Sequence, residues 1–185
     1  MINQTICEVC DSELKGPILD LGFHLLCDDL ISISTSQGVP TYAQVIQLCR
    51  NCLTAHQLAP VDKEILFKPE YHYRSSLTED VLKGMRDLVA ATLAFLPTNH
   101  QPKILDVGCN DGSLLGFFKD NIQCLTLGID PTDAIREAGS KVDHTFQDYF
   151  DEDLAVKIFK SYGTMDLITF TNVFAHIENL SLIHI

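Results

Sequence analysis

The chain has 185 residues, of which 46% are hydrophobic, and its formal net charge at pH 7 is −12. This length allows one domain of ordinary size or two small ones. The acidic balance argues against a nucleic-acid partner, because phosphate backbones select basic surfaces. No apolar run reaches about 18 residues, which argues against a membrane span. The start of the chain, MINQTICEVC, lacks the basic and apolar regions of a secretory signal. We therefore expect a cytoplasmic protein whose seven cysteines stay reduced.

Residues 1–65 contain two cysteine pairs with C-x2-C spacing, Cys7 with Cys10 and Cys49 with Cys52. The apolar runs in KGPILDLGFH and QGVPTYAQVIQLC predict short strands or turns. Four thiolates can surround a zinc ion tetrahedrally, and a region with little core needs such a crosslink to fold. The alternatives are four unrelated cysteines or a redox-active pair. The remaining cysteines are expected to be small packing residues: Cys27, Cys109 and Cys124.

A connector, residues 66–76, leads to a predicted helix over about residues 78–96. Ser76 and Glu79 have capping-box spacing at the start of this helix, and Pro97 ends it. Its apolar residues recur at three- and four-residue spacing and lie on one face: Val81, Leu82, Met85, Leu88, Val89 and Leu93.

After this helix, short strands alternate with short helices. Strands are predicted in KILDVG, CLTLGID, VDHTFQD and DLITFTNV, and helices in GSLLGFFKD, TDAIREAGS and DEDLAVKIFKSY. This alternation predicts an α/β fold with a parallel sheet and right-handed crossovers.

The segment ILDVGCNDGSLL reads as a strand, a tight turn and the start of a helix. Gly108 and Gly112 have no side chains, so a ligand can approach their backbone closely, and the helix amides face the same crevice. Asp130 ends the next strand, 22 residues after Gly108, where its carboxylate can accept both hydroxyls of a ribose. The dinucleotide pattern G-x-G-x-x-G is absent, because Asn110 occupies its middle position. The alternative is that both glycines merely form a turn.

The form D-V-G-x-N-x-G resembles motif I of class I S-adenosylmethionine (SAM) methyltransferases. The cysteine-paired module, DLGFHLLCDDL, VDKEILFKPEYHYRSS, this motif and TNVFAHIENL follow one another in order. Over residues 5–180 the chain thus resembles the sugar C-methyltransferases that act on nucleotide-linked 4-keto-deoxysugars. The resemblance implies a zinc-binding domain over 1–65, a connector over 66–76 and an incomplete Rossmann-like SAM domain over 77–185.

The resemblance also implies roles for particular residues. The zinc ligands would be Cys7, Cys10, Cys49 and Cys52. Tyr71 or Tyr73 and His176 would lie in the active site; the alternative is that these rings only pack. The SAM contacts would be Asp106, Gly108, Asn110, Gly112, Asp130, Asp148, Tyr149 and Asn172, with Asp130 at the ribose and Asp148 beside the adenine. The family's proposed base lies in a Y-H-E-H-type stretch that has no counterpart here.

The segment LSLIHI at the end of the sequence also has no counterpart in the family, and it resembles a translated transposon-end sequencing adaptor. We therefore expect that the chain is C-terminally truncated, that Leu180 to Ile185 are not native and that His184 has no role. A natural short C-terminus is the alternative. A truncated sheet would expose the strand in LITFTNVF as an apolar edge, which favours aggregation, and we expect little methyl transfer from the chain alone.

The predicted function is that of a SAM-dependent C-methyltransferase with zinc and SAM as cofactors and a nucleotide-linked 4-keto-deoxysugar as its small-molecule substrate. One alternative is a SAM methyltransferase with another small-molecule acceptor. Others are a non-catalytic zinc- and nucleotide-binding module, or a short regulatory relative that binds SAM without turnover.

Overall fold

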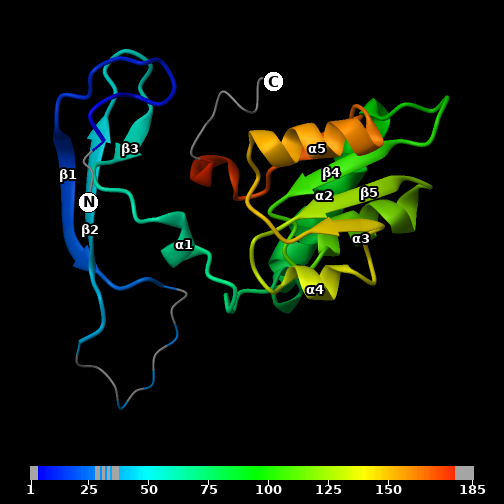
Figure 1. The fold of residues 1–185 in the computed structure, drawn as a ribbon, viewed down its shortest axis with the longest axis horizontal. Coiled ribbons are helices and arrows are strands. Elements are labelled where there is room, and N and C mark those ends of the chain that lie inside the picture. The colour runs from blue at the N-terminus through cyan, green and yellow to red at the C-terminus, as the bar shows by residue number, and fades with distance from the viewer. Residues whose placement is uncertain (1–3, 28–29, 31, 33, 35–37, 178–185) are drawn as a thin grey trace. The chain divides into compact units, whose positions relative to one another are not determined.

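A computed structural model describes residues 4–27, 30, 32, 34 and 38–177 of the chain. These residues form two compact units, one ending at Leu66 and the other spanning Phe67–Ile177 (Figure 1). The expectations for Leu180 to Ile185 and for His184 concern residues outside the described part. No helix within the described ranges is long and apolar enough to cross a membrane.

The first unit contains a small antiparallel sheet. Its strands are β1 (Pro17–His24), β2 (Tyr42–Leu48) and β3 (Ala55–Gln57), in the order β1-β2-β3, and a short helix α1 (Lys63–Leu66) follows. The buried apolar cluster of this unit consists of Cys7, Leu14 and Cys49, with Cys10 and Cys52 packed beside them. So small a core cannot stabilise a unit of this size alone, which is consistent with a metal crosslink.

The second unit is built on a parallel sheet, which confirms the predicted α/β fold. Its strands are β4 (Lys103–Val107), β5 (Leu125–Ile129), β6 (His144–Phe146) and β7 (Leu167–Thr169). The strand order is β6-β5-β4-β7, and each neighbouring pair is parallel. All four carboxyl ends therefore lie along one edge of the sheet.

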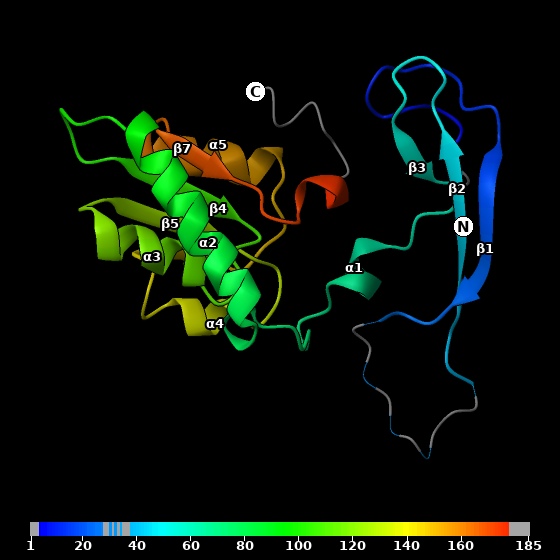
Figure 2. The same cartoon turned by 180° about the vertical axis from the view of Figure 1, so that it is seen from behind.

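Helices cover both faces of this sheet. The helices α2 (Glu79–Thr92), α3 (Ser113–Asn121) and α4 (Ile135–Ala138) pack on one face, where Ile104 of β4 joins their apolar side chains. The neighbouring residues Leu105 and Val107 contribute to the opposite cluster, with α5 (Glu152–Tyr162). Successive side chains of a strand point to opposite faces, and buried parallel strands need apolar residues on both. Figure 2 shows α2 crossing the sheet on the face nearest the viewer.

Two details of the sequence-based expectations are wrong. Helix α2 starts at Glu79 with Thr78 as its N-cap, and no side chain caps it, so the capping box of Ser76 and Glu79 does not form. Ser76 instead lies in a 3-10 turn, Ser75–Leu77, and its amide donates to Asp111. The helix also ends earlier than expected, at Thr92, and a 3-10 turn follows it.

The three cysteines outside the C-x2-C pairs differ in burial. Cys109 and Cys124 are buried, as expected for small packing residues. Cys27 is exposed, so its expected packing role is wrong.

Candidate functional site

The four paired cysteines meet at one place in the first unit. Cys7 Sγ lies 3.5 Å from Cys52 Sγ, and Cys10 Sγ lies 3.6 Å from Cys49 Sγ. All four sulfur atoms lie within 4.8 Å of one another. A tetrahedral zinc site has Zn–S bonds of about 2.3 Å, which place its sulfur atoms roughly 3.8 Å apart. The cluster therefore has the size of a zinc site.

Each cysteine pair is held in the same kind of turn. The Cys7 amide donates to Ser12 O at 2.8 Å, and the Asp11 amide donates to Cys7 O at 2.9 Å. The second pair repeats this pattern, with Cys49 and Leu53 in the places of Cys7 and Asp11. Asp11 and Leu53 each follow the second cysteine of a pair and have φ of 57° and 63°. This left-handed residue reverses the chain, so both sulfur atoms of a pair point to the same side.

The thiols of the cluster lie in very different surroundings. Burial raises the pKa of the Cys7 thiol to about 12. Hydrogen bonds with Ser12 and Asn51 lower the pKa of the Cys10 thiol to about 5. Ionised Cys7 therefore needs a cation nearby at neutral pH, and a zinc ion bound by the cluster would supply that charge.

His56 is a fifth polar residue at this cluster, and no sequence pattern indicates it. Its Nε2 lies 3.2 Å from Cys7 Sγ, and the residue is only 8% exposed. His56 lies in β3 and has no spacing relation to the C-x2-C pairs, so only the folded structure brings it to the sulfur.

In the second unit, the glycine turn between β4 and α3 lies at the carboxyl ends of the strands. The Gly108 amide donates to Ile129 O at 2.7 Å, and Gly108 and Gly112 have φ of 73° and 74°. A Cβ at Gly108 would lie 2.2 Å from Val173 Cγ2, and one at Gly112 would lie 2.8 Å from Ala138 Cβ. Both glycines are thus required by the backbone and by the packing of neighbouring elements. Close approach of a ligand to them stays a prediction.

Two buried carboxylates lie beside this turn. Asp130 Oδ2 accepts from the backbone N–H of Asn110 at 2.9 Å. Its Oδ1 accepts from the backbone N–H and the hydroxyl of Thr132 at 2.9 and 2.6 Å. Asp106 accepts from the Thr169 hydroxyl at 2.6 Å. Burial, together with the negative charge of Asp130, raises the pKa of Asp106 to about 7. The sequence identified both aspartates, but not the threonines that orient them.

The charge around the turn is predominantly negative. Asp106, Asp130 and Asp111 are all buried and act on the same region. A lysine also lies here, with Lys141 Nζ 3.8 Å from Asp111 Oδ1. Such surroundings repel a pyrophosphate and favour a ligand that carries positive charge, such as a sulfonium or an ammonium group.

Residues 67–76, which we call the strap, contact the loops that follow all four strands of this sheet. The contacts join Ser75 N to Asn110 Oδ1 (2.9 Å), Asp133 N to Pro69 O (2.9 Å), Tyr149 OH to Phe67 O (3.2 Å) and the ring of Phe67 to that of His176 (5.0 Å). These partners follow β4, β5, β6 and β7 in turn. The strap therefore crosses the carboxyl edge of the sheet, where parallel sheets bind ligands.

The predicted active-site side chains lie close to one another through Phe67. The Phe67 ring contacts those of His176 and Tyr71, with centroids 5.0 and 6.0 Å apart, and Tyr71 lies 6.5 Å from Tyr73. His176 is exposed in the 3-10 turn Phe174–His176, and Tyr73 is also exposed. The sequence did not indicate Phe67, because one aromatic residue in a connector has no periodic pattern.

The other predicted SAM contacts lie along the same edge. Asp148 is exposed after β6, and the half-buried Tyr149 follows it. Asn172 is exposed after β7, with φ of 57°, and precedes the Val173 that packs on Gly108. The predicted set thus lies in loops that adjoin one another, and its contact with a ligand stays a prediction.

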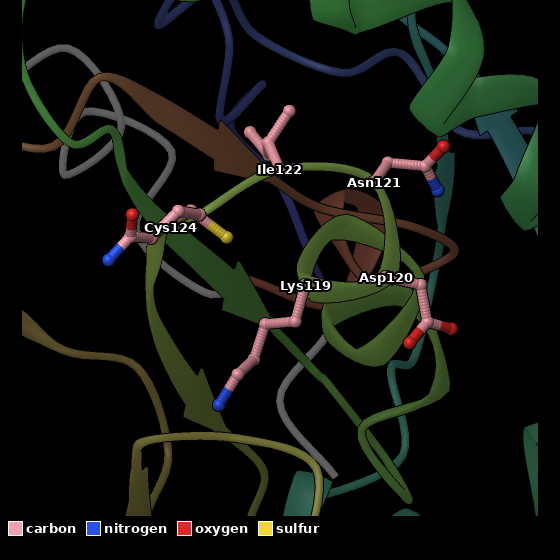
Figure 3. A pocket seen from close by; sticks show the side chains of 6 residues that line it. Lys119, Asp120, Asn121, Ile122 and Cys124 are labelled. Atoms are coloured by element: carbon pink, nitrogen blue, oxygen red, sulfur yellow. The ribbon is translucent and has the colours of Figure 1, made fainter.

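A hollow of about 410 Å³ lies elsewhere, lined by residues 119–124 (Figure 3). It is formed where α3 ends and β5 begins, at the amino ends of the strands. Figure 3 shows Lys119 and Cys124 among its side chains. Parallel sheets bind ligands at the other end of their strands, so we assign the function to the strap-covered edge and not to this hollow.

Two family models match the chain. One, described as "Putative zinc binding domain", matches residues 7–67. The other, described as "Methyltransferase domain", matches residues 77–183, more than half of the chain. The chain belongs to this methyltransferase family. No curated protein matches it.

Among solved structures, the methyltransferase is similar to three structures of the plantazolicin methyltransferase BpumL. One is described as in complex with SAH, and two also contain a desmethylPZN analog. In each case the identity is 24%, the TM-score is 0.40, and the match covers 56% of this chain and 39% of the other. The chain thus spans well under half the length of that protein, and a TM-score this low supports no inference about function.

Membership of a methyltransferase family implies SAM as the methyl donor, and the zinc-binding match together with the cysteine cluster implies zinc as the metal. Both groups suit the residues present. Four thiols of the right separation surround the metal position. The acidic turn of the methyltransferase domain suits the positive sulfur of SAM.

Proposed function

We propose that the protein is a SAM-dependent C-methyltransferase whose acceptor is a nucleotide-linked 4-keto-deoxysugar. The observation that carries the methyltransferase part is the acidic glycine turn bound by a strap whose Phe67 ring contacts both His176 and Tyr71. The sugar acceptor rests on the order of the motifs along the chain. We also propose a cytoplasmic location, which would keep the zinc thiols reduced. The domains proposed are 1–65 and 77–185, with 66–76 as connector.

We propose that Asp130 binds the ribose of the donor. Its two oxygens each accept hydrogen bonds from the protein, which fixes the plane of the carboxylate. A carboxylate has about four acceptor positions, and these bonds occupy three of them, so one position on Oδ2 remains for a ribose hydroxyl. Asp148 and Tyr149 would adjoin the adenine, and Asn172 would lie beside Gly108 and Gly112 near the rest of the donor.

The chemistry needs an acidic proton on the acceptor and a stabilised enolate. A 4-keto group acidifies the proton on C3 of the sugar, and a general base takes that proton to leave an enolate that attacks the methyl carbon. The resemblance places this base in the Y-H-E-H-type stretch that has no counterpart in this sequence. Bound SAM supplies that methyl group from a positive sulfur that leaves as a neutral thioether. Tyr71, Tyr73 and His176 carry the O–H and N–H groups that could donate to the enolate oxygen, and the strap would exclude water.

The test is a product analysis with SAM that carries a ¹³C-methyl group. The zinc-loaded protein is incubated with a nucleoside-diphosphate-linked 4-keto-deoxysugar, and the product is examined by NMR and mass spectrometry. The proposal predicts a methyl carbon bonded to C3. A labelled methyl group on oxygen or nitrogen of another acceptor would exclude C-methylation of the sugar. The assignment of methyltransferase activity would still stand.

A second measurement separates the two halves of the reaction. In D₂O without SAM, deprotonation would exchange the C3 proton of the sugar for deuterium. Exchange without methyl transfer would show a working acceptor site and a defective donor site. If the protein transfers the labelled methyl group to another acceptor and does not exchange the C3 proton of the sugar, the sugar assignment fails.

A further inference from the structure

Asn110 has a side chain at the position where the dinucleotide pattern has its second glycine. Its φ is 50°, a left-handed conformation that asparagine tolerates better than most residues. At this position glycine allows a backbone to approach a ligand closely. The asparagine therefore keeps the turn conformation and adds a side-chain amide that can form hydrogen bonds.

The Asn110 side chain binds the strap on both of its polar atoms. Its Oδ1 accepts from the Ser75 amide at 2.9 Å, and its Nδ2 donates to Tyr73 O at 3.2 Å. Ser75 is only 4% exposed, so its amide has poor access to water. Because an unpaired buried amide is costly, removal of the Asn110 side chain should release this end of the strap.

Asp111 continues the same contact. Its Oδ2 accepts from the Ser76 amide at 3.0 Å, and its Oδ1 accepts from the Ser113 hydroxyl at 2.7 Å. Burial alone would raise the pKa of Asp111, but hydrogen bonds from Ser113 and Ser76 outweigh it and lower the pKa. The carboxylate is therefore ionised at neutral pH and joins the strap to the first turn of α3.

We propose that Asn110 and Asp111 are positioning residues that fasten the strap to the donor-binding turn, so that donor binding and the order of the tyrosine segment are coupled. The fastening follows from the contacts above. The coupling rests on the proposed function, because it requires that SAM binds at the turn. The two residues thus act on Tyr71 and Tyr73, and their side chains point to the strap.

Arg74 offers a direct measure of strap opening. Its Nε lies 2.7 Å from Glu137 Oε1 and its Nη1 donates to the carbonyl groups of Tyr71 and Tyr73, so the closed strap protects the bond that trypsin cleaves. The other basic residue of the strap, Lys68, precedes Pro69 and is therefore resistant. The rate of cleavage after Arg74 therefore reports opening of the strap. Intact mass spectrometry on the full zinc-loaded chain measures this rate.

The informative variant is Asn110→Gly, because glycine keeps the left-handed turn without strain. Loss of two hydrogen bonds should speed cleavage after Arg74 about tenfold. Asn110→Asp keeps the acceptor for the Ser75 amide, so its rate of cleavage after Arg74 should lie between those of Asn110→Gly and the wild type. The matched control is Asn121→Ala, whose amide donates to Phe117 O within α3. It should cleave like the wild type.

Hydrogen exchange at the Ser75 and Ser76 amides gives a second measure that does not depend on the protease. Faster exchange of both amides in Asn110→Gly, with unchanged exchange in β4 and β5, is the expected result. Unchanged cleavage after Arg74 and unchanged exchange at Ser75 in Asn110→Gly would overturn the proposal.

SAH is the probe for coupling. Saturating SAH should slow cleavage after Arg74 several-fold in the wild type and much less in Asn110→Gly. Equal protection of both proteins would overturn the coupling. If SAH protects neither protein, yet Asn110→Gly is cleaved faster, the fastening stands and donor binding at the turn, hence the proposed function, fails.

Discussion

Asp106, the residue before the last of β4, is 1% exposed, and its carboxyl group accepts one hydrogen bond from Thr169. Burial raises its pKa from 3.8 to about 7. Between these two pH values the folded state binds more protons at Asp106 than the unfolded state does. The contribution of this group to the free energy of unfolding therefore falls as the pH rises from about 4 to about 7.

We predict that Asp106→Asn is more thermostable than the wild type at pH 8, with a gain in Tm of roughly 5 °C that shrinks toward pH 4. Asparagine keeps an acceptor for Thr169 and cannot ionise. Thermal unfolding of the protein without SAM, followed between pH 4 and pH 8, measures this.

Asp143 is the matched control for Asp106. Burial opposes its ionisation, but hydrogen bonds from Lys119 and Thr126 outweigh it, and its pKa is lowered. Its stabilisation is present above the pKa of the unfolded state, so Asp143→Asn should lower Tm at pH 8. A loss of Tm in both variants at that pH would contradict our account of Asp106.

His56 lies 3.2 Å from Cys7 Sγ and would orient that sulfur as a zinc ligand. Partners of this kind typically change metal affinity by about 10- to 100-fold when they are removed. We predict that His56→Ala releases zinc to a chelator at least about tenfold faster than the wild type. A chromogenic chelator measures the rate. His100→Ala, in the other unit, should have no effect, and equal release from all three proteins would exclude the role of His56.

Strand β7 is an edge of the sheet within the described residues, hydrogen-bonded to β4 alone. Its Ile168 is 45% exposed, and an exposed apolar edge favours pairing with other chains. We predict that Ile168→Lys raises the soluble fraction of the purified chain several-fold and leaves the circular dichroism unchanged.

Val156 provides the control for this effect. It is 42% exposed, but it lies in α5, where the backbone groups bond within the helix. Val156→Lys should improve solubility much less than Ile168→Lys. An equal increase in the soluble fraction of both variants would show that aggregation depends on exposed apolar area and not on the open strand edge.

The elements that the sequence predicted well are those with local patterns. The apolar runs of β4 and β5 and the periodic face of α2 depend on neighbours in the chain. The predicted capping box does not form, and the Ser76 amide instead donates a hydrogen bond to Asp111, 35 residues away. From the sequence the strap is only a connector, because its conformation depends on hydrogen bonds with loops that follow different strands. Such contacts leave no periodic pattern in the sequence.

The candidate sites were predictable to different degrees for the same reason. C-x2-C spacing places two sulfur atoms within one turn, so Cys7 and Cys10 could be paired from the sequence. Two such pairs in one short region also predicted that Cys49 and Cys52 complete a four-thiolate zinc site. His56, Phe67 and Thr132 lacked any such spacing and were found only in three dimensions.

The molecule consists of two units that differ in what stabilises them. Among the described residues, the first buries only Cys7, Leu14 and Cys49 in its apolar cluster, whereas the second has two larger clusters, one on each face of its sheet. Metal removal should therefore unfold the first unit and leave the second folded.

We predict that a strong chelator abolishes amide protection in β1 and β2 and leaves β4 and β5 protected. Hydrogen exchange with mass spectrometry measures both units in one sample, and added zinc should restore the first. Simultaneous loss of protection in both units, or full retention in β2 without metal, would contradict this division.

Direct binding of SAH to the full zinc-loaded chain, by calorimetry at neutral pH, tests the central claim that this is a SAM-dependent methyltransferase. The account predicts one site and a loss of affinity of at least about tenfold in Asp130→Ala, because hydrogen bonds to a carboxylate are strong. Asp120→Ala, at an exposed position of α3, should bind normally. An SAH analogue without ribose hydroxyls should bind the wild type as weakly as SAH binds Asp130→Ala, which checks the contact without a variant. No binding of SAH, or binding of NAD in its place, would contradict the account.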